Sequence, residues 1–392
     1  MSVRTSAGPA AGPLARPSAG PARTLAGAAA ALLLGLTVTA PAHADVGAGT
    51  HAAARVGAVH LVGPGESIQQ AVDRAAPGDT VLIPPGTYHG SVQISVPGLT
   101  LRGLGPQTVI SGQGTSSPQT ADAAAAPDSA AAACAQAGHG ICVTGTAGHR
   151  LADVTIEALT VSGFAKNGIS ATETDRMTVR QVLVRDNGQE GISQERSTRG
   201  RFQGNEALRN GEAGIFLANF VDVDGGATDT DGALVADNHL ADNRIGVVLR
   251  RLRNLSVERN DITGNCTGVF VVGDENVPRG GDLDVRLNRV NANNRYCPSN
   301  GKLPFLQGSG IVLTGVEQTR VTGNEVVGNT GAAPMSGGIV LFRSFVGGPS
   351  TDNTISRNVL RDNGPADLAD RDTGSNTFAG NQCRTSEPAG RC

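Results

Sequence analysis

The sequence predicts an all-β solenoid, a single-stranded parallel β-helix, from two repeated features and the lack of a third. Gly-Ile or Gly-Val pairs recur at Gly140, Gly168, Gly191, Gly214, Gly246, Gly268, Gly310 and Gly338. Asparagines five residues apart recur in the same phase, as in Asn205 with Asn210. The repeat shows no run of 3.6-period apolar residues long enough for a crossover helix. Roughly 22 or 23 residues with three short β-type stretches make one coil, so about ten coils are expected.

The asparagines five residues apart are expected to form ladders along the stack of coils. Equivalent residues of neighbouring coils lie about 4.8 Å apart, the ordinary spacing of paired strands. An Asn side chain can then hydrogen-bond to the coils above and below, and Asn tolerates the left-handed backbone of tight corners. We therefore interpret these residues as structural: Asn205, Asn210, Asn238, Asn243, Asn260, Asn265, Asn288, Asn293, Asn324, Asn329, Asn358 and Asn363.

The repeat resembles the right-handed parallel β-helix repeats (PbH1) of pectate-lyase-like proteins. The stretch from Gly65 to Val72, continuing from Pro77 to Tyr88, resembles the capped start of such a helix. That superfamily includes polysaccharide lyases, pectin hydrolases, alginate epimerases and accessory proteins of nitrous oxide reductase. The resemblance implies the fold and leaves the reaction open, because one fold hosts many chemistries.

The first 44 residues have the features of a bacterial secretory signal. Three arginines precede residue 24, residues 25–40 are apolar, and residues 42–44 form a small-x-small cleavage site. We expect a secreted, extracellular protein that is cut after Ala44. No other segment approaches the length of a membrane span.

The rest of the chain reads as one β-helix domain with short flanking segments. Ser67-Ile68-Gln69-Gln70 is a capping box for a short helix that ends at Pro77-Gly78 and covers the open end of the first coil. The expected divisions are a lead-in over residues 45–63, the β-helix over residues 64–383 with a low-complexity loop at 113–138, and a tail over residues 384–392.

Six cysteines fit an oxidising compartment. Six cysteines allow fifteen pairings, and we expect the three that are local in sequence: Cys134 with Cys142, Cys266 with Cys297, and Cys383 with Cys392. The middle bridge would staple a loop to its neighbouring coil, since Cys297 lies one coil after Cys266. A metal–thiolate site is disfavoured because no Cys-x-x-Cys occurs.

The composition of the chain disfavours some classes of binding partner. A net charge of -3 argues against nucleic acid. The chain has no Trp and only two Tyr, which counts against a strong platform for stacking sugar rings. A solenoid needs no second core, so we expect one domain. We also expect a monomer.

The outer face of the strand that opens each coil is the expected site, because long loops flank it in the middle and C-terminal coils. From Phe216 onward the outward residues are mostly apolar, in contrast to the acids and bases of a lyase groove. Two explanations compete: the long loop with Leu303, Pro304, Phe305 and Leu306 buries this strip, or the strip docks a partner. We favour burial.

A polar cluster at one edge of the strip contains the candidate catalytic residues. Arg251 and Arg253 lie between Asp222 and Asp224 of one neighbouring coil and Asp274 of the other. Lyases of the superfamily that the repeat resembles use an Arg or Lys as base, with Ca²⁺ held by acids against the uronate carboxylate. By that resemblance Arg251, Arg253 and Asp274 are assigned catalytic roles. An exposed salt-bridged loop is the alternative.

Calcium is the one cofactor that the sequence suggests. The carboxylates that could bind it are Asp222, Asp224, Asp229 and Asp231, although the spacing is not that of an EF-hand. The residues assigned to substrate binding are Arg250, Phe270, Tyr296 and Lys302. A second patch is interpreted as ordinary surface charge: Lys166, Glu190, Glu195 and Arg196.

Three functions remain open. By resemblance, the leading hypothesis is a protein that binds or processes an extracellular acidic polysaccharide, as in a Ca²⁺-assisted lyase. The alternative is a non-catalytic cell-envelope or interaction scaffold, favoured by the apolar strip and the few aromatic residues. A third hypothesis, an accessory protein for metalloenzyme maturation, depends on repeat similarity alone. A groove open to solvent above Arg250 and Phe270 would favour the first function, whereas a loop packed over it, or a flat apolar strip, would favour the second.

Overall fold

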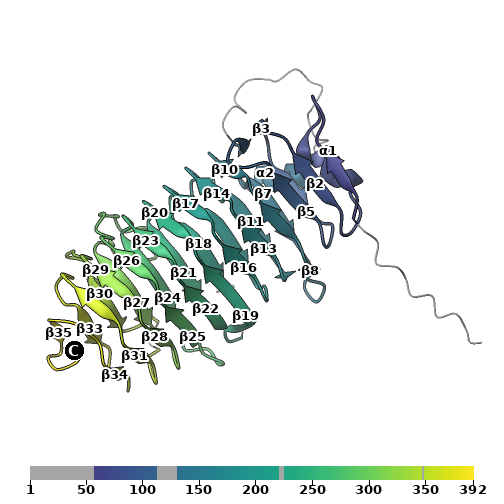
Figure 1. Cartoon of the computed structure of the whole chain (residues 1–392). Helices are drawn as coiled ribbons and strands as arrows, with labels where there is room; N and C mark the ends of the chain where they lie inside the picture. The colour runs from purple at the N-terminus through teal and green to yellow at the C-terminus, as the bar shows by residue number, and fades with distance from the viewer. Residues whose placement is uncertain (1–56, 113–129, 220–224, 347) are drawn as a thin grey trace, which may run out of the picture. The chain divides into compact units, whose positions relative to one another are not determined.

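The structure is a computed structural model that describes residues 57–112, 130–219, 225–346 and 348–392. Within these residues the strands of successive coils lie side by side and build three long parallel sheets, as Figure 1 shows. The parallel β-helix predicted from the repeat is thereby confirmed. The secretory signal with its cut after Ala44, most of the lead-in, Asp222 and Asp224 lie outside the described residues.

The strand that opens each coil belongs to a sheet that we call the opening sheet. Its strands, in the order of the stack, are β4 (Val92–Ile94), β7 (Ile141–Thr144), β11 (Ile169–Thr172), β15 (Ile192–Glu195), β18 (Ala213–Ala218), β21 (Ile245–Arg250), β24 (Thr267–Val272), β27 (Ser309–Thr314), β30 (Gly337–Phe342), β33 (Leu368–Arg371) and β35 (Ser386–Glu387).

The chain then turns into the second sheet. Its strands are β1 (Val59–Leu61), β2 (Thr80–Ile83), β5 (Thr100–Gly103), β9 (Thr155–Glu157), β13 (Thr178–Arg180), β16 (Arg201–Gln203), β19 (Thr228–Ala236), β22 (Leu252–Glu258), β25 (Gly281–Arg286), β28 (Arg320–Thr322), β31 (Thr354–Ser356) and β34 (Thr377–Ala379).

The third sheet completes each coil. Its strands are β3 (Gly86–His89), β6 (Thr108–Ser111), β10 (Thr160–Ser162), β14 (Leu183–Arg185), β17 (Glu206–Leu208), β20 (His239–Ala241), β23 (Asp261–Thr263), β26 (Arg289–Asn291), β29 (Glu325–Val327) and β32 (Val359–Arg361). A short two-stranded sheet pairs β8 (Leu151–Ala152) with β12 (Thr174–Asp175).

The core lies between the three sheets. Alternate residues of every strand point inward, so inward positions of neighbouring coils stack in register, as in Ile192 on Ile215. These inward side chains belong to one buried apolar cluster that continues from Val62 to Leu368. The outward residues of the opening sheet are separate from this cluster, and they form the face on which the candidate site lies.

Two asparagine ladders bind the coils together at their corners, as predicted. Asn260 is typical: its Nδ2 donates to Oδ1 of Asn288 at 2.9 Å, while its own Oδ1 accepts from Nδ2 of Asn238 at 2.8 Å. The second ladder runs in the same way through Asn265. Two further asparagines were not predicted: Asn187 extends the second ladder, and Asn381 extends the first.

The left-handed backbone of these corners does not fall on the ladder asparagines themselves. It falls on the residue before each of them, such as Asp237 with φ 57° and Arg259 with φ 54°. The Asn backbone N–H is instead used within the ladder, since that of Asn260 donates to Oδ1 of Asn288 at 3.0 Å. The expected tolerance of Asn for left-handed backbone is therefore not the reason that Asn occupies these positions.

Two short helices accompany the coils. Helix α1 (Ile68–Arg74) has the predicted capping box: Ser67 Oγ accepts from the backbone N–H of Gln70 at 3.2 Å, and Gln70 Oε1 accepts from that of Ser67 at 3.1 Å. The helix packs against β2 and β4. Helix α2 (Ala130–Gln136) was expected to be part of a loop. Its run of alanines, the strongest helix formers, explains the difference.

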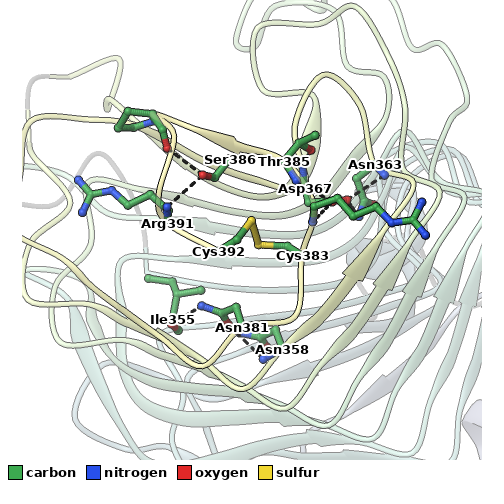
Figure 2. The surroundings of a disulfide bond; sticks show 12 residues. Ile355, Asn358, Asn363, Asp367, Asn381, Cys383, Thr385, Ser386, Arg391 and Cys392 are labelled. Atoms are coloured by element: carbon green, nitrogen blue, oxygen red, sulfur yellow. Dashed lines mark hydrogen bonds between the residues drawn. A yellow bond between two sulfur atoms is a disulfide. The ribbon is translucent and has the colours of Figure 1, made fainter.

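All three predicted disulfides are present: Cys134 with Cys142, Cys266 with Cys297, and Cys383 with Cys392. Figure 2 shows the last of these beside the C-terminal end of the second ladder, where Asp367 replaces an asparagine. Asp367 Oδ1 accepts from Nδ2 of Asn363 at 3.0 Å, and its Oδ2 accepts from the backbone N–H of Arg384 at 2.9 Å.

No helix in the described part of the chain is long and apolar enough to cross a membrane.

Candidate functional site

The outer face of the opening sheet carries two parallel rows of side chains, because outward positions repeat every second residue and stack between coils. The first row contains Ser170, Ser193, Phe216, Val248, Phe270, Val312 and Val340. The second row contains Thr172, Glu195, Ala218, Arg250, Val272, Thr314 and Phe342. Both rows were predicted, and their register is confirmed.

The C-terminal half of this face is buried beneath a loop. Val312 and Val340 are 0% exposed and belong to an apolar cluster with Leu306 and Met335. Leu306 comes from the long loop between Asn293 and Gly310. Of the two explanations for the apolar strip, burial by this loop is therefore confirmed.

The N-terminal half of the face remains open and forms a groove of about 790 Å³. Its floor includes Ser170, Ser193 and Phe216 of the first row. Lys302 and Leu303 of the covering loop form part of one wall. Arg250 and Phe270, which were assigned to substrate binding, also line the groove, as does the third such residue, Lys302.

Two carboxyl groups in the groove have raised pKa values. Burial raises the pKa of Glu190 from 4.5 to about 7, and the nearby charges of Glu212 and Glu195 add to the effect, while Lys302 opposes it. Burial likewise raises the pKa of Glu195, against the opposing charge of Arg250. A carboxyl group whose pKa is near 7 can donate or accept a proton at physiological pH, which is the requirement for general acid–base catalysis.

Cationic side chains lie close to these acids. Lys166, Arg250 and Lys302 all line the groove. The guanidinium carbon of Arg250 lies 5.2 Å from the centre of the Phe216 ring, a cation–π distance that holds Arg250 over the floor. His139 lines the N-terminal side, and burial together with the charge of Lys166 lowers the pKa of its imidazole.

Three of these lining residues were interpreted from sequence as ordinary surface charge: Lys166 is indeed exposed, whereas Glu190 and Glu195 are half-buried. Lys166, Glu190 and Glu195 lie in the groove. The sequence did indicate that two of them lie near the outer face of the opening sheet: Glu190 directly precedes an opening Gly, and Glu195 is an outward residue of the second row. The raised pKa of Glu190 was not visible in the sequence, because it depends on the folded surroundings, including the charge of Glu212 and that of Lys302 more than a hundred residues away.

The predicted catalytic residues lie in ion pairs at the side of the coils. Arg251 is 2% exposed, and its Nε lies 2.9 Å from Oδ2 of Asp274, which is 15% exposed. Arg253 Nη1 lies 2.7 Å from Oε1 of Glu317. The sequence correctly placed Arg251 beside Asp274. Their catalytic role stays a prediction, and the groove described above is lined by other residues.

The remaining predicted residues are spread over the surface. Tyr296 is 63% exposed and lines a separate cavity of about 510 Å³ with Arg209, Arg244 and Arg295. Asp229 accepts from Nδ2 of Asn254 at 3.0 Å. Asp231 Oδ2 lies 3.2 Å from Nη1 of Arg199.

The calcium prediction concerns a loop that the structure describes only in part. Over residues 57–112, 130–219, 225–346 and 348–392, no group of three or more His, Cys, Asp or Glu side chains is placed to hold a metal ion. Asp222 and Asp224 lie outside these ranges, so binding of Ca²⁺ stays a prediction.

Comparison with known proteins agrees with the architecture. The family model for a right-handed β-helix region matches residues 131–225 and 221–346. A search of curated proteins gave no match.

Several solved structures have a similar fold. The A-module of the mannuronan C-5 epimerase AlgE4 from Azotobacter vinelandii has a TM-score of 0.50 and 16% identity, over 82% of this chain and 93% of that one. A family 28 exopolygalacturonase from Yersinia enterocolitica has a TM-score of 0.51 and 14% identity, over 84% of this chain and 77% of that one. An alginate lyase from Paenibacillus has a TM-score of 0.49 and 16% identity, over 82% of this chain and 96% of that one.

Identities this low show likeness of fold and do not transfer an activity. The family match, however, covers more than half of the chain and falls on the stacked coils. The chain therefore belongs to the right-handed parallel β-helix family, with the pectate-lyase-like architecture.

Proposed function

We propose that this protein binds and processes an extracellular acidic polysaccharide in the groove on its opening sheet. The observation that carries the proposal is Glu190, a carboxyl group in an open groove whose pKa is raised to about 7. A structural surface has no need of such a group, whereas acid–base chemistry on a sugar does.

The surroundings of Glu190 favour an acidic sugar. When Glu190 is protonated, three cationic side chains face the carboxylates of Glu195 and Glu212 in the groove. Lys166 and Lys302 are exposed, so both can turn toward a ligand. A uronate carboxylate would be held by these cations, while an apolar face of the sugar ring would lie against Phe216. The fold shared with a mannuronan epimerase module and an exopolygalacturonase agrees with this substrate class.

In the proposed reaction Glu190 is the proton donor. Protonated near pH 7, it would transfer its proton to the glycosidic oxygen as the bond to the leaving sugar breaks. The carbon that loses this bond would either bond to the oxygen of a water molecule whose proton passes to Glu195, or form a double bond to C5 as Glu195 removes the C5 proton. Donation by a positioned acid is typically worth 10²–10⁴-fold in rate. This assignment gives Glu190 the acid–base role that sequence reasoning gave to Arg251 and Arg253.

Secretion and calcium complete the proposal. Three disulfides support a place outside the cytoplasm, in the periplasm or the extracellular space. The proposal also includes export through the N-terminal signal. It further includes assistance by Ca²⁺ bound near Asp222, Asp224, Asp229 and Asp231. Calorimetric titration of Ca²⁺ into the mature protein, with the Asp229→Ala variant beside it, tests the second.

The main test is turnover of oligouronates by the wild-type protein and by Glu190→Gln. Incubation with oligomannuronate and oligogalacturonate should release new reducing ends, and absorbance of unsaturated products will show whether the bond breaks by elimination. Glu190→Gln should lower the rate at least a hundredfold without loss of the folded circular dichroism spectrum.

Glu206→Gln is the matched control, since Glu206 is an exposed carboxylate on β17 of the third sheet, away from the groove. It should leave both turnover and stability unchanged. If neither polymer is bound or altered by the folded wild-type protein, the proposal fails and the non-catalytic scaffold becomes the better hypothesis.

A further inference from the structure

The groove has one blind end. Toward the C-terminus its floor passes under the covering loop, where Val312 is 0% exposed and Thr314, its neighbour in the second row, is 1% exposed. The first row is already buried at Val248 and Phe270, which are 7% and 3% exposed, and the second row closes at Thr314. A sugar chain lying along the second row meets this closure after Val272, because the next residue of that row, Thr314, is buried.

The cover that closes this end is fixed in place. The Cys266–Cys297 disulfide ties the loop to the coil below it. Cys297 and Leu306 exchange two backbone hydrogen bonds of 2.9 Å, which hold the two arms of the loop together. Arg244, only 7% exposed, donates from Nη1 to the carbonyl oxygen of Pro298 at 2.8 Å. These contacts make the cover a fixed wall.

The opposite end of the groove is open along the second row. Helix α2 covers the first row there, since Cys142 is 7% exposed and bonded to Cys134. In the second row, however, Thr144 is exposed and Thr172 is half-buried. A chain that starts at the blind end can leave the groove over these threonines.

We infer that the groove receives the terminus of an acidic polysaccharide, with the last sugar held at the blind end beside Arg250, Phe270 and Lys302, and does not bind the interior of a continuous chain. The blind end supplies the chemistry for a terminal uronate: Arg250 and Lys302 face its carboxylate, and the half-buried Leu303 contacts its apolar face. This inference rests on the proposed function, because it specifies the substrate of the same groove.

Oligouronates blocked at one end or the other test the inference. Binding to the wild-type protein is measured by calorimetry for an oligomannuronate or oligogalacturonate hexamer in three forms: unmodified, with a bulky group on the reducing end, and with a bulky group on the non-reducing end. One of the two blocked forms should bind at least tenfold more weakly than the free hexamer, and the other should bind normally.

A variant of the covering loop tests whether that loop closes the blind end. Replacing residues 299–304 by Gly-Gly keeps Cys297 and Leu306 but shortens the wall and removes Lys302 and Leu303, so it should weaken binding of the free hexamer and reduce the difference between the free hexamer and the form that the wild-type protein rejects. If this variant does not fold, the three hexamers with the wild-type protein still decide the matter. Equal binding of all three overturns the blind-end inference while leaving the proposed function intact. Binding of none overturns both.

Discussion

Glu190 shows how a single residue connects the fold to the chemistry. It lies in the turn that precedes an opening strand, where a neighbouring coil and the covering loop limit its contact with water. The sequence gives the position of this carboxyl group but not its pKa, because the cause is burial by residues that are distant in the chain.

The raised pKa of Glu190 predicts that stability falls as pH rises. The folded protein keeps the proton up to about pH 7, whereas the unfolded chain releases it near 4.5. The unfolding free energy should therefore decrease between these two pH values, by about 2 kcal/mol after allowance for the partly solvated side chain. Urea unfolding at pH 5 and pH 8 measures the difference.

Glu190→Gln should abolish this decrease, because a neutral amide does not titrate. Glu206→Gln should keep it. A wild-type pH dependence that survives in Glu190→Gln would mean that another group is responsible and that Glu190 is ionised at neutral pH.

Arg251 is expected to be a structural residue, and its substitution tests the catalytic role that the sequence suggested. In Arg251→Met the carboxylate of Asp274 loses its partner while it remains largely buried, which should cost about 3 kcal/mol of unfolding free energy. Turnover per folded molecule should be unchanged. Adding Asp274→Asn should recover part of the lost stability, because the unpaired charge is then removed.

Urea unfolding and rate measurements on the same samples separate the two roles. Arg201→Ala is the control, since Arg201 is an exposed residue of β16. Normal stability combined with a large loss of turnover in Arg251→Met would return Arg251 to the catalytic site.

At the scale of the element, the sequence predicted most of what is strictly periodic. The two rows of the opening sheet and the asparagine ladders follow from a repeat with one register, since a residue shift would turn every inward side chain outward. The covering loop could be predicted from the length of the segment between Asn293 and Gly310. Helix α2 could not, because a short alanine-rich stretch also fits a flexible loop.

The ladders should contribute strongly to stability, since each asparagine serves two neighbouring coils. Asn260 is 1% exposed, and besides its two ladder bonds its Nδ2 donates to the carbonyl oxygen of Val235 at 3.0 Å. Asn260→Ala would leave these buried partners unsatisfied, at a cost of about 3 kcal/mol or more. Asn291→Ala, on the half-exposed β26 position, should cost less than about 1 kcal/mol. A similar small loss for both variants in urea unfolding would contradict the ladder's role.

At the scale of the whole molecule, the described coils carry one continuous apolar core, and the disulfides lie at three places along it. Cys134–Cys142 and Cys266–Cys297 hold the covers at the two ends of the groove, while Cys383–Cys392 holds the C-terminal segment. The same bonds that suit an oxidising compartment thus also shape the proposed binding face. The pairing could be predicted from sequence, but its relation to the groove required the stacking of the coils.

Asp367 ends the second ladder, and it should make the C-terminal coils sensitive to acid. Its carboxylate is 2% exposed; burial alone would raise its pKa, but hydrogen bonds from Arg384, Asn363 and Thr385 outweigh that effect and lower the pKa below 3.8. The stabilisation is therefore complete above pH 3.8 and is lost as the pH falls toward the folded pKa. Asp367→Asn should lose about 3 kcal/mol at pH 7, because the amide cannot accept from all these donors, and this deficit should shrink as the pH falls below 3.8. Asp362→Asn, a change at a neighbouring carboxylate that is 72% exposed, should have little effect at either pH.

Urea unfolding at pH 7 and pH 3 measures the loss of stability in both variants. A loss in Asp367→Asn that grows on acidification would show that Asp367 is protonated in the folded protein.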